Sequence, residues 1–337
     1  MMVRPLSRWC MFSLPFFVLL VAFGHAEEVE QLIARAKQAE QGGQLDAAAE
    51  LYHRAAAVRP AGFNIQYGVG LHCVRLENWA EAEEHLAKAL SLRPDFAPAH
   101  LNLGAVYSQN GQRKEARRAF TQAIRFDPLL SRGYYNLGVL ELDDGRLDTA
   151  ETLFQRAIVI SPTHQASYVR LGNVYVRKRE YTLARHVLGK ALRFRPDDAK
   201  AFFSLGLAHE GLGEDEAAVA AFRMAIELNP SYGGAYYNLG TLLIKMKDYH
   251  AALEPLYEAI RLNPQSSDAP YNLAVAQAQL GEKLQALDPL KKAIELQPDL
   301  AAEAERDPEF QRLQADPDFR AITRQGSSRD HGDDEHE

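Results

Sequence analysis

Apolar side chains recur along the chain in pairs of helical stripes, and a short polar turn separates the two stripes of each pair. Within residues 97–130, the first stripe consists of Leu103, Val106 and Tyr107, whose spacing places them on one face of an α-helix. The second stripe consists of Ala116, Ala119, Phe120, Ala123 and Ile124. Gly111 lies between the stripes, where a left-handed turn carries no side-chain penalty, and Pro128 ends the second stripe. The pattern predicts a helix, a turn and a second helix.

This pattern returns every 34 residues. Eight prolines keep the period without a slip: Pro60, Pro94, Pro128, Pro162, Pro196, Pro230, Pro264 and Pro298. Each proline is preceded by an alanine at five residues and by another at twelve residues. A glycine lies 24 residues before six of them: Gly70, Gly104, Gly138, Gly172, Gly206 and Gly240. Self-similarity at a fixed period indicates a protein built from stacked structural repeats.

The repeat resembles that of the tetratricopeptide repeat (TPR) family, which has small residues at three fixed positions and a proline near its end. One unit reads Tyr236-Tyr237-Asn238-Leu239-Gly240 and ends in Asn263-Pro264. The resemblance implies an all-α solenoid, a right-handed superhelix of antiparallel helix pairs. Its eight units would be 29–62, 63–96, 97–130, 131–164, 165–198, 199–232, 233–266 and 267–300.

Two glycine positions carry different expectations. Glycine inside a helix costs about 1 kcal/mol relative to alanine. We therefore expect the six helical glycines to allow close approach to the alanines of the partner helix. The turn glycine is present in five units (Gly43, Gly111, Gly145, Gly213 and Gly281), and Glu77, Arg179 and Lys247 replace it in the others.

Residues 1–26 read as a secretory signal peptide. Two arginines precede an apolar run at residues 9–23, and Gly24-His25-Ala26 places small residues before a cleavage point. Cleavage after Ala26 would give a periplasmic or secreted protein. The alternative is an uncleaved segment that anchors the chain in the membrane, although 15 helical residues span only about 22 Å of a core of about 30 Å.

The period stops after Pro298. Residues 301–325 contain scattered apolar side chains and are predicted to cap the last repeat, whose outer face would otherwise be open; a degenerate ninth repeat is the alternative. Residues 326–337 have no apolar side chain and are predicted to form a disordered acidic tail.

Composition and charge exclude several functions. The 337 residues include 38 basic and 45 acidic side chains, and the net charge of −7 argues against a nucleic-acid partner. Two cysteines are too few for a disulfide framework or a four-cysteine zinc site. His209-Glu210 begins like a zinc-protease motif, but Gly213 occupies the place of its second histidine. We expect no catalytic residues, no metal and no cofactor, and hence not an enzyme.

A partner-binding groove is the expected functional site. In TPR proteins the first helix of each unit lines the concave side, and one position there holds Asn102, Asn136, Asn238 and Asn272. These residues resemble the asparagine ladder of the O-linked N-acetylglucosamine transferases, whose carboxamides hold an extended peptide. Arg170 and Ser204 interrupt the ladder. Asparagine could equally be a residue that simply suits this position in many TPR units.

Aromatic and charged residues extend the same face. The aromatic candidates are Tyr135, Phe203, Tyr237 and Tyr271, which either contact a partner or pack between repeats. The charged and polar candidates are Arg132, Arg170, Asn173, Arg177 and Lys200. Asn173 and Lys200 match two positions of a set that grips a C-terminal carboxylate in the family, but Val169 and Ser204 break the set.

The charge of the middle of the chain suggests a kind of partner. Residues 113–195 contain 16 basic and 8 acidic side chains, net +8, so the groove could prefer an acidic segment, although ordinary solvated charge explains the same count. The predicted function is a non-enzymatic scaffold that binds a protein or extended peptide. The alternative is a structural subunit of an envelope assembly, for secretion, pili or polysaccharide export, held through its convex face or ends.

Overall fold

The computed structural model describes residues 28–39, 41–58 and 62–329. The expected signal peptide, Pro60 and residues 330–337 of the expected tail lie outside the described residues. Contacts divide the chain into two compact units, Met1–Pro162 and Thr163–Glu337. Every regular element in the described ranges is helical, which confirms the predicted all-α TPR architecture.

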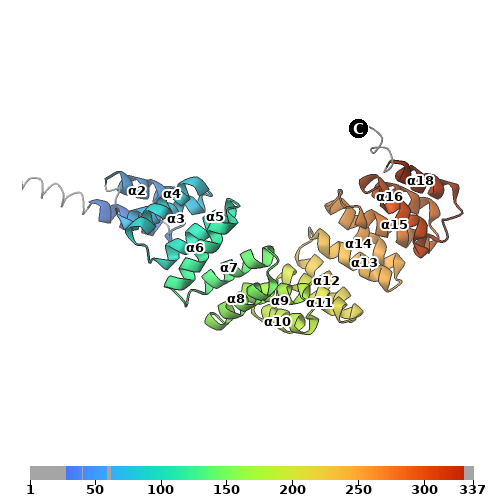
Figure 1. Ribbon diagram of the computed structural model, residues 1–337, viewed down its shortest axis with the longest axis horizontal. Helices are drawn as coiled ribbons and strands as arrows, with labels where there is room; N and C mark the ends of the chain where they lie inside the picture. Colours follow the sequence, from blue (N-terminus) through green and yellow to red (C-terminus); the bar gives the residue numbers. More distant parts are fainter. Residues whose placement is uncertain (1–27, 40, 59–61, 330–337) are drawn as a thin grey trace, which may run out of the picture. The chain divides into compact units, whose positions relative to one another are not determined.

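The first unit is a series of helical hairpins. Residues 28–39 are helical, and the elements that follow are α2 (Leu45–Val58), α3 (Phe63–Arg75), α4 (Trp79–Leu92), α5 (Ala97–Gln109), α6 (Arg113–Phe126), α7 (Ser131–Asp143) and α8 (Leu147–Ile160). The two helices of each predicted repeat lie side by side, as Figure 1 shows for α3 with α4 and α5 with α6.

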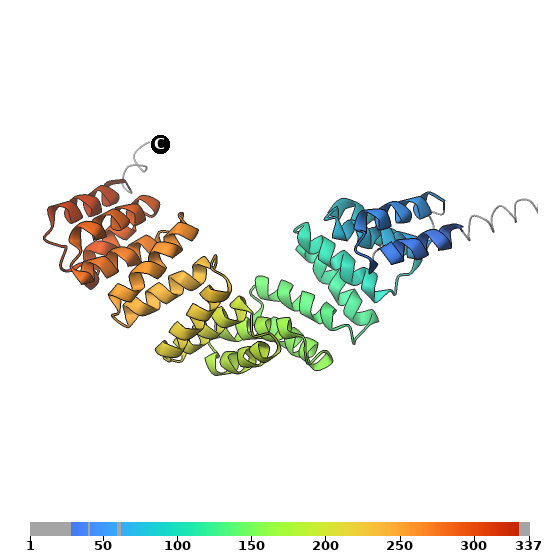
Figure 2. The same ribbon diagram turned by 180° about the vertical axis from the view of Figure 1, so that it is seen from behind.

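The second unit continues the same pattern and ends differently. Its hairpins are α9 (Gln165–Arg177), α10 (Tyr181–Phe194), α11 (Ala199–Gly211), α12 (Asp215–Leu228), α13 (Gly233–Lys245), α14 (Tyr249–Leu262), α15 (Asp268–Leu280) and α16 (Lys283–Leu296). They are followed by α17 (Leu300–Arg306), a short 3-10 helix η1 (Pro308–Phe310) and α18 (Pro317–Arg329). Figure 2 shows the hairpins of this unit from behind, with α17 and α18 next to the last one.

Each hairpin turn has the same backbone geometry. After α5, the amide of Gly111 donates to the carbonyl of Ser108 and the amide of Gln112 donates to that of Tyr107, which is a Schellman motif. Gly111 has a φ of 73°, in the left-handed region. The same region is occupied at Glu77, Arg179 and Lys247, with φ of 56°, 60° and 64°. The turn is therefore retained where glycine is absent, at the cost of backbone strain.

The helical glycines face large side chains, which corrects the expectation that they face alanines. A β-carbon on Gly138 would lie 2.8 Å from Cε1 of Phe154, and one on Gly172 would lie 2.5 Å from Leu188. The repeat alanines are also buried, with Ala150 and Ala157 both 0% exposed. The second helix turns one large side chain toward the first, and only glycine leaves room for it.

Residues after Pro298 cover the last hairpin. Phe310 and Leu313 are 0% exposed and Phe319 is 1% exposed, in one core cluster with Leu290 of α16. The hydroxyl of Tyr271 in α15 donates to Asp307 over 2.9 Å. The segment predicted as a cap thus lies on repeat eight.

The C-terminal helix is longer than the sequence suggested. α18 continues to Arg329, so residues 326–329 are helical although they were expected to belong to the disordered tail. Adding a residue to an existing helix fixes few dihedral angles for one more hydrogen bond, so a helix can continue into a polar segment. Within the described ranges, no helix combines the length and apolar character that crossing a bilayer requires.

Candidate partner-binding surfaces

The predicted groove residues all lie on the first helices of their hairpins. In the first unit they are on α5 and α7, and in the second unit on α9, α11, α13 and α15. Arg132, Arg177 and Lys200 are exposed, whereas the four asparagines are half-buried. The helical register therefore leaves the polar candidates of each unit accessible.

In the first unit, Asn102 is held on two sides. Its Nδ2 donates to the carbonyl of Pro98 over 2.8 Å and to the hydroxyl of Tyr67 over 3.2 Å. Burial raises the pKa of Tyr67, and the bond from Asn102 and the charge of Arg132 oppose that rise. Asn136 makes no hydrogen bond to the residues that the structure describes, so its whole carboxamide is available.

In the second unit, two inner positions are linked from one repeat to the next. The hydroxyl of Ser204 in α11 donates to Oδ1 of Asn173 in α9. Nδ2 of Asn272 in α15 donates to the hydroxyl of Thr241 in α13 over 3.3 Å. Ser204, which interrupts the row of asparagines in the sequence, thus bonds to Asn173, another of the predicted groove residues. Sequence reasoning missed Thr241, although its polar side chain at the repeat position of Asn173 was a usable signal.

Asn238 is held by its own helix. Its Nδ2 donates to the carbonyl of Gly234, four residues back, over 2.7 Å. Asn102 makes the same bond to Pro98. In both side chains the amide nitrogen thus donates within the protein, and Oδ1 remains free to accept a hydrogen bond.

The aromatic candidates pack largely within the protein. Tyr135 lies 5.9 Å from Phe154, and Phe203 lies 5.8 Å from Phe222, measured between ring centroids. Tyr237 is half-buried against a small core cluster. Tyr271 is only 8% exposed because η1 and Phe310 cover it, so it is a core residue rather than a groove residue.

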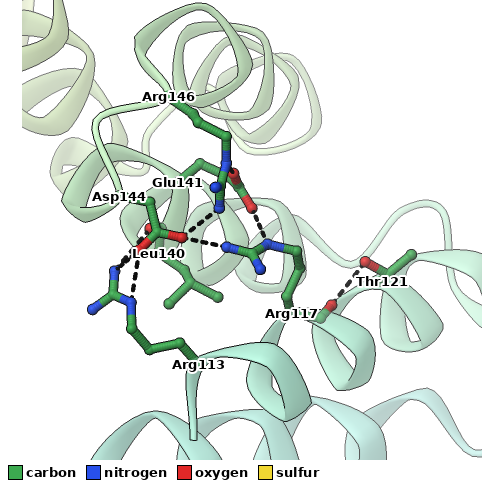
Figure 3. A network of polar contacts seen from close by, with 7 residues as sticks. All are labelled: Arg113, Arg117, Thr121, Leu140, Glu141, Asp144 and Arg146. Atoms are coloured by element: carbon green, nitrogen blue, oxygen red, sulfur yellow. Dashed lines mark hydrogen bonds and ion pairs between the residues drawn. The ribbon is translucent and has the colours of Figure 1, made fainter. Parts of the chain in front are cut away.

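Much of the positive charge in the middle of the chain is paired. Figure 3 shows Glu141 and Asp144 of the first unit surrounded by Arg113, Arg117 and Arg146. Nε of Arg117 lies 2.8 Å from Glu141, and Nε of Arg113 lies 2.7 Å from Asp144. The Glu141 carboxylate raises the pKa of Arg117 by hydrogen bonding. These three arginines stabilise the packing of α6, α7 and α8 and are not free cations for a partner.

Arg170 differs from those arginines. It is half-buried on α9 and has no carboxylate partner among the described residues, so its charge stays available within the second unit. Other basic side chains of that unit are paired, such as Arg185 with Glu214 at 2.5 Å.

Reactive groups are scarce in the described ranges. They contain no cluster of three His, Cys, Asp or Glu side chains suited to a metal ion. Cys73 is 2% exposed, and burial, with a smaller effect of Glu81, raises the pKa of its thiol to about 12. The thiol is therefore a small buried hydrophobe and not a nucleophile.

The comparisons with known proteins agree with this architecture. Profiles described as "Tetratricopeptide repeat" match residues 101–164, 169–233 and 234–266. The profile of the middle TPR-like domain of cilia and flagella-associated protein 70 matches residues 32–129, and that of anaphase-promoting complex subunit 5 matches residues 267–303. The chain belongs to the tetratricopeptide repeat family. Such a fold is a scaffold for protein–protein interaction.

Solved structures with this fold are numerous. YrrB, described as "a TPR protein with an unusual peptide-binding site", is 30% identical, with 57% of this chain and all of that chain covered and a TM-score of 0.48. A tetratricopeptide repeat protein from Parabacteroides merdae is 18% identical, covering 70% and 93%, with a TM-score of 0.55. PilF of Pseudomonas aeruginosa is 18% identical, covering 61% and 94%, with a TM-score of 0.55. The last two share the fold alone. No curated protein matches the sequence.

Proposed function

We propose that the first helices of the repeats bind an extended segment of a partner protein through its main chain. The observation that supports this most is the arrangement of Asn102 and Asn238, whose amide nitrogens donate to carbonyls of their own helices. The remaining oxygens accept main-chain N–H groups without regard to sequence. Asn136, which has no internal partner among the described residues, offers both a donor and an acceptor.

The same proposal includes an acidic stretch in the partner. Arg170 is available in the second unit, and Lys200 is exposed on the next first helix. A carboxylate that pairs with these side chains would make binding weaken as salt is added, because screening acts on exposed charges. Arg170→Gln combined with Lys200→Gln should therefore remove the salt dependence of binding and leave the main-chain contacts in place.

Affinity capture from the native cell envelope, followed by mass spectrometry, tests the proposal. Asn136→Ala with Asn238→Ala should reduce the recovered partner at least tenfold and leave the melting temperature unchanged. The matched control is Asn110→Ala with Asn263→Ala, because these exposed asparagines lie at helix ends. Equal recovery with both pairs would show that the partner binds elsewhere.

We further propose that residues 1–26 direct export to the periplasm or the exterior, with cleavage after Ala26. The basic start and apolar run of this segment support the proposal. N-terminal sequencing of the protein from its native envelope should begin at Glu27. A chain that still begins at Met1 in the membrane fraction would instead support an anchor.

A further inference from the structure

The second unit contains a cavity of about 240 Å³ that belongs to none of the surfaces above. Its walls come from the second helices of two adjacent repeats, α12 and α14, and its floor comes from α13. The cavity is smaller than the roughly 300–1,000 Å³ of a typical small-molecule site. It is large enough for one side chain of a partner.

The floor of this cavity is apolar. Leu239 and Leu243 of α13 are each 4% exposed, and Ile226 of α12 adjoins them. On the opposite wall stand Ala251 and Pro255 of α14. An entering side chain therefore needs an aliphatic portion to cover these groups.

The rim of the cavity is charged and unpaired. Glu227 on α12 and Glu254 on α14 are exposed, and neither forms an ion pair with another described residue. Arg223 is also exposed and unpaired there, so the rim has a net charge of −1. Burial raises the pKa of the Tyr236 hydroxyl, the charges of Glu258 and Glu254 raise it further, and the charge of Arg261 lowers it.

Pro255 adds one more acceptor. It lies inside α14 and has no amide hydrogen, so the carbonyl of Ala251 lacks the donor normally found four residues further on. Ala251 and Pro255 both line the cavity. An apolar floor is thus combined with two carboxylates and a main-chain carbonyl without its helical donor.

We propose that this cavity binds an arginine side chain of a partner protein. Its methylene stem lies on Leu239 and Leu243, and its guanidinium donates to Glu227 and Glu254. A guanidinium carries five N–H donors in a planar fork, which suits several acceptors at once. The site lies on different helix faces from the inner asparagines, so it does not depend on the function proposed above.

Methyl NMR of the full chain tests this site, with Nα-acetyl-arginine methylamide as the probe. The probe should shift the methyl signals of Ile226, Leu239 and Leu243 and saturate in the millimolar range. The norleucine analogue, which has the stem without the charge, should give less than one tenth of that shift. Equal shifts from norleucine, or larger shifts from the glutamate analogue through Arg223, would overturn the proposal.

Two sets of variants complete the test. Glu227→Gln with Glu254→Gln should weaken arginine binding at least fivefold. Asp288→Asn with Glu295→Gln is the matched control, because these residues occupy the same repeat positions in α16 and are also exposed. Ala251→Leu should block the cavity, and Leu183 at the equivalent position of α10 shows that the helix accepts leucine there. Unchanged arginine binding in the variant with Glu227→Gln and Glu254→Gln would disprove the site.

Discussion

In six hairpins, a glycine of the first helix contacts a large side chain of the second helix. A helical glycine at the eighth repeat position receives a phenylalanine or leucine from the second helix, as Gly104 receives Phe120 and Gly206 receives Phe222. Phe120 is 2% exposed and Phe222 is 0% exposed. The helical penalty of glycine, about 1 kcal/mol, is smaller than the gain of about 1.5–3 kcal/mol from burying the large side chain.

Gly138→Leu tests this pairing. A β-carbon there would lie 2.8 Å from Phe154, so we expect overpacking to lower the free energy of unfolding by about 1–3 kcal/mol. Urea denaturation followed by circular dichroism measures the change. Gly189→Leu is the control, because Gly189 is an exposed helical glycine with nothing within 4 Å of a β-carbon. A similar loss of stability in both variants would contradict a specific role for the contact between Gly138 and Phe154.

Sequence reasoning located this glycine but not its partner. Periodicity predicts which positions face the core. Alanines and a large residue share one face of the second helix, however, and the period does not tell which of them contacts the glycine. The inner asparagines show the same limit. Their positions follow from the period, whereas the bonds of Asn272 to Thr241 and of Ser204 to Asn173 depend on how neighbouring helices approach.

At the scale of helices, one ion network joins three elements of the first unit. Glu141 in α7 accepts from Arg117 in α6 and from Arg146 just before α8 (Figure 3). The Glu141 side chain is only 5% exposed, and those of the two arginines are 33% and 45% exposed. Removing the charge of this buried carboxylate is costly, because two guanidinium groups must then share Asp144 as their remaining partner.

Glu141→Gln should therefore destabilise the first unit. The glutamine keeps the shape and loses the charge, and we expect a loss of about 1–3 kcal/mol in the free energy of unfolding. Urea denaturation at low and high salt provides the measurement, and the loss should shrink at high salt. Glu115→Gln, an exposed residue of α6, is the control. Equal free energies of unfolding for the two variants would mean that the network does not stabilise the first unit.

The cavity between α12 and α14 also belongs to the scale of helices. The sequence does not reveal its volume, because the cavity is formed by residues of three helices, among them Ile226, Leu239 and Ala251. Other units carry bulkier residues at the position of Ala251, such as Leu183. Comparing repeat positions would have identified the small residue, but not the volume that it leaves.

At the scale of the whole chain, the array needs a cover at its C-terminal end. Phe310, Leu313 and Phe319 supply it, and they form one core cluster with Tyr271 and Leu290 of the last hairpin. The scattered apolar residues after the last period led us to expect a cap in this segment. Its detailed form, a short helix, a 3-10 turn and a longer helix, has no periodic template and could not be derived.

Ending the chain at Pro298 should expose the apolar face of the last repeat. We expect a lower melting temperature and concentration-dependent association, because a solenoid without its cap presents a hydrophobic surface. Calorimetry and analytical ultracentrifugation measure the two effects. A chain ending at Arg329 keeps α18 and should behave like the full protein. A monomeric, equally stable chain ending at Pro298 would contradict a capping role.

The pairing of glycine with a large side chain has a consequence for how such a chain changes over generations. Gly70 with Leu86, Gly138 with Phe154 and Gly240 with Leu256 each complete their contact inside one 34-residue segment. An unequal recombination that adds or removes one segment therefore transfers both partners together. The number of repeats can therefore change by whole repeats while every glycine keeps its large partner. The surfaces formed by the repeats lengthen or shorten with the array.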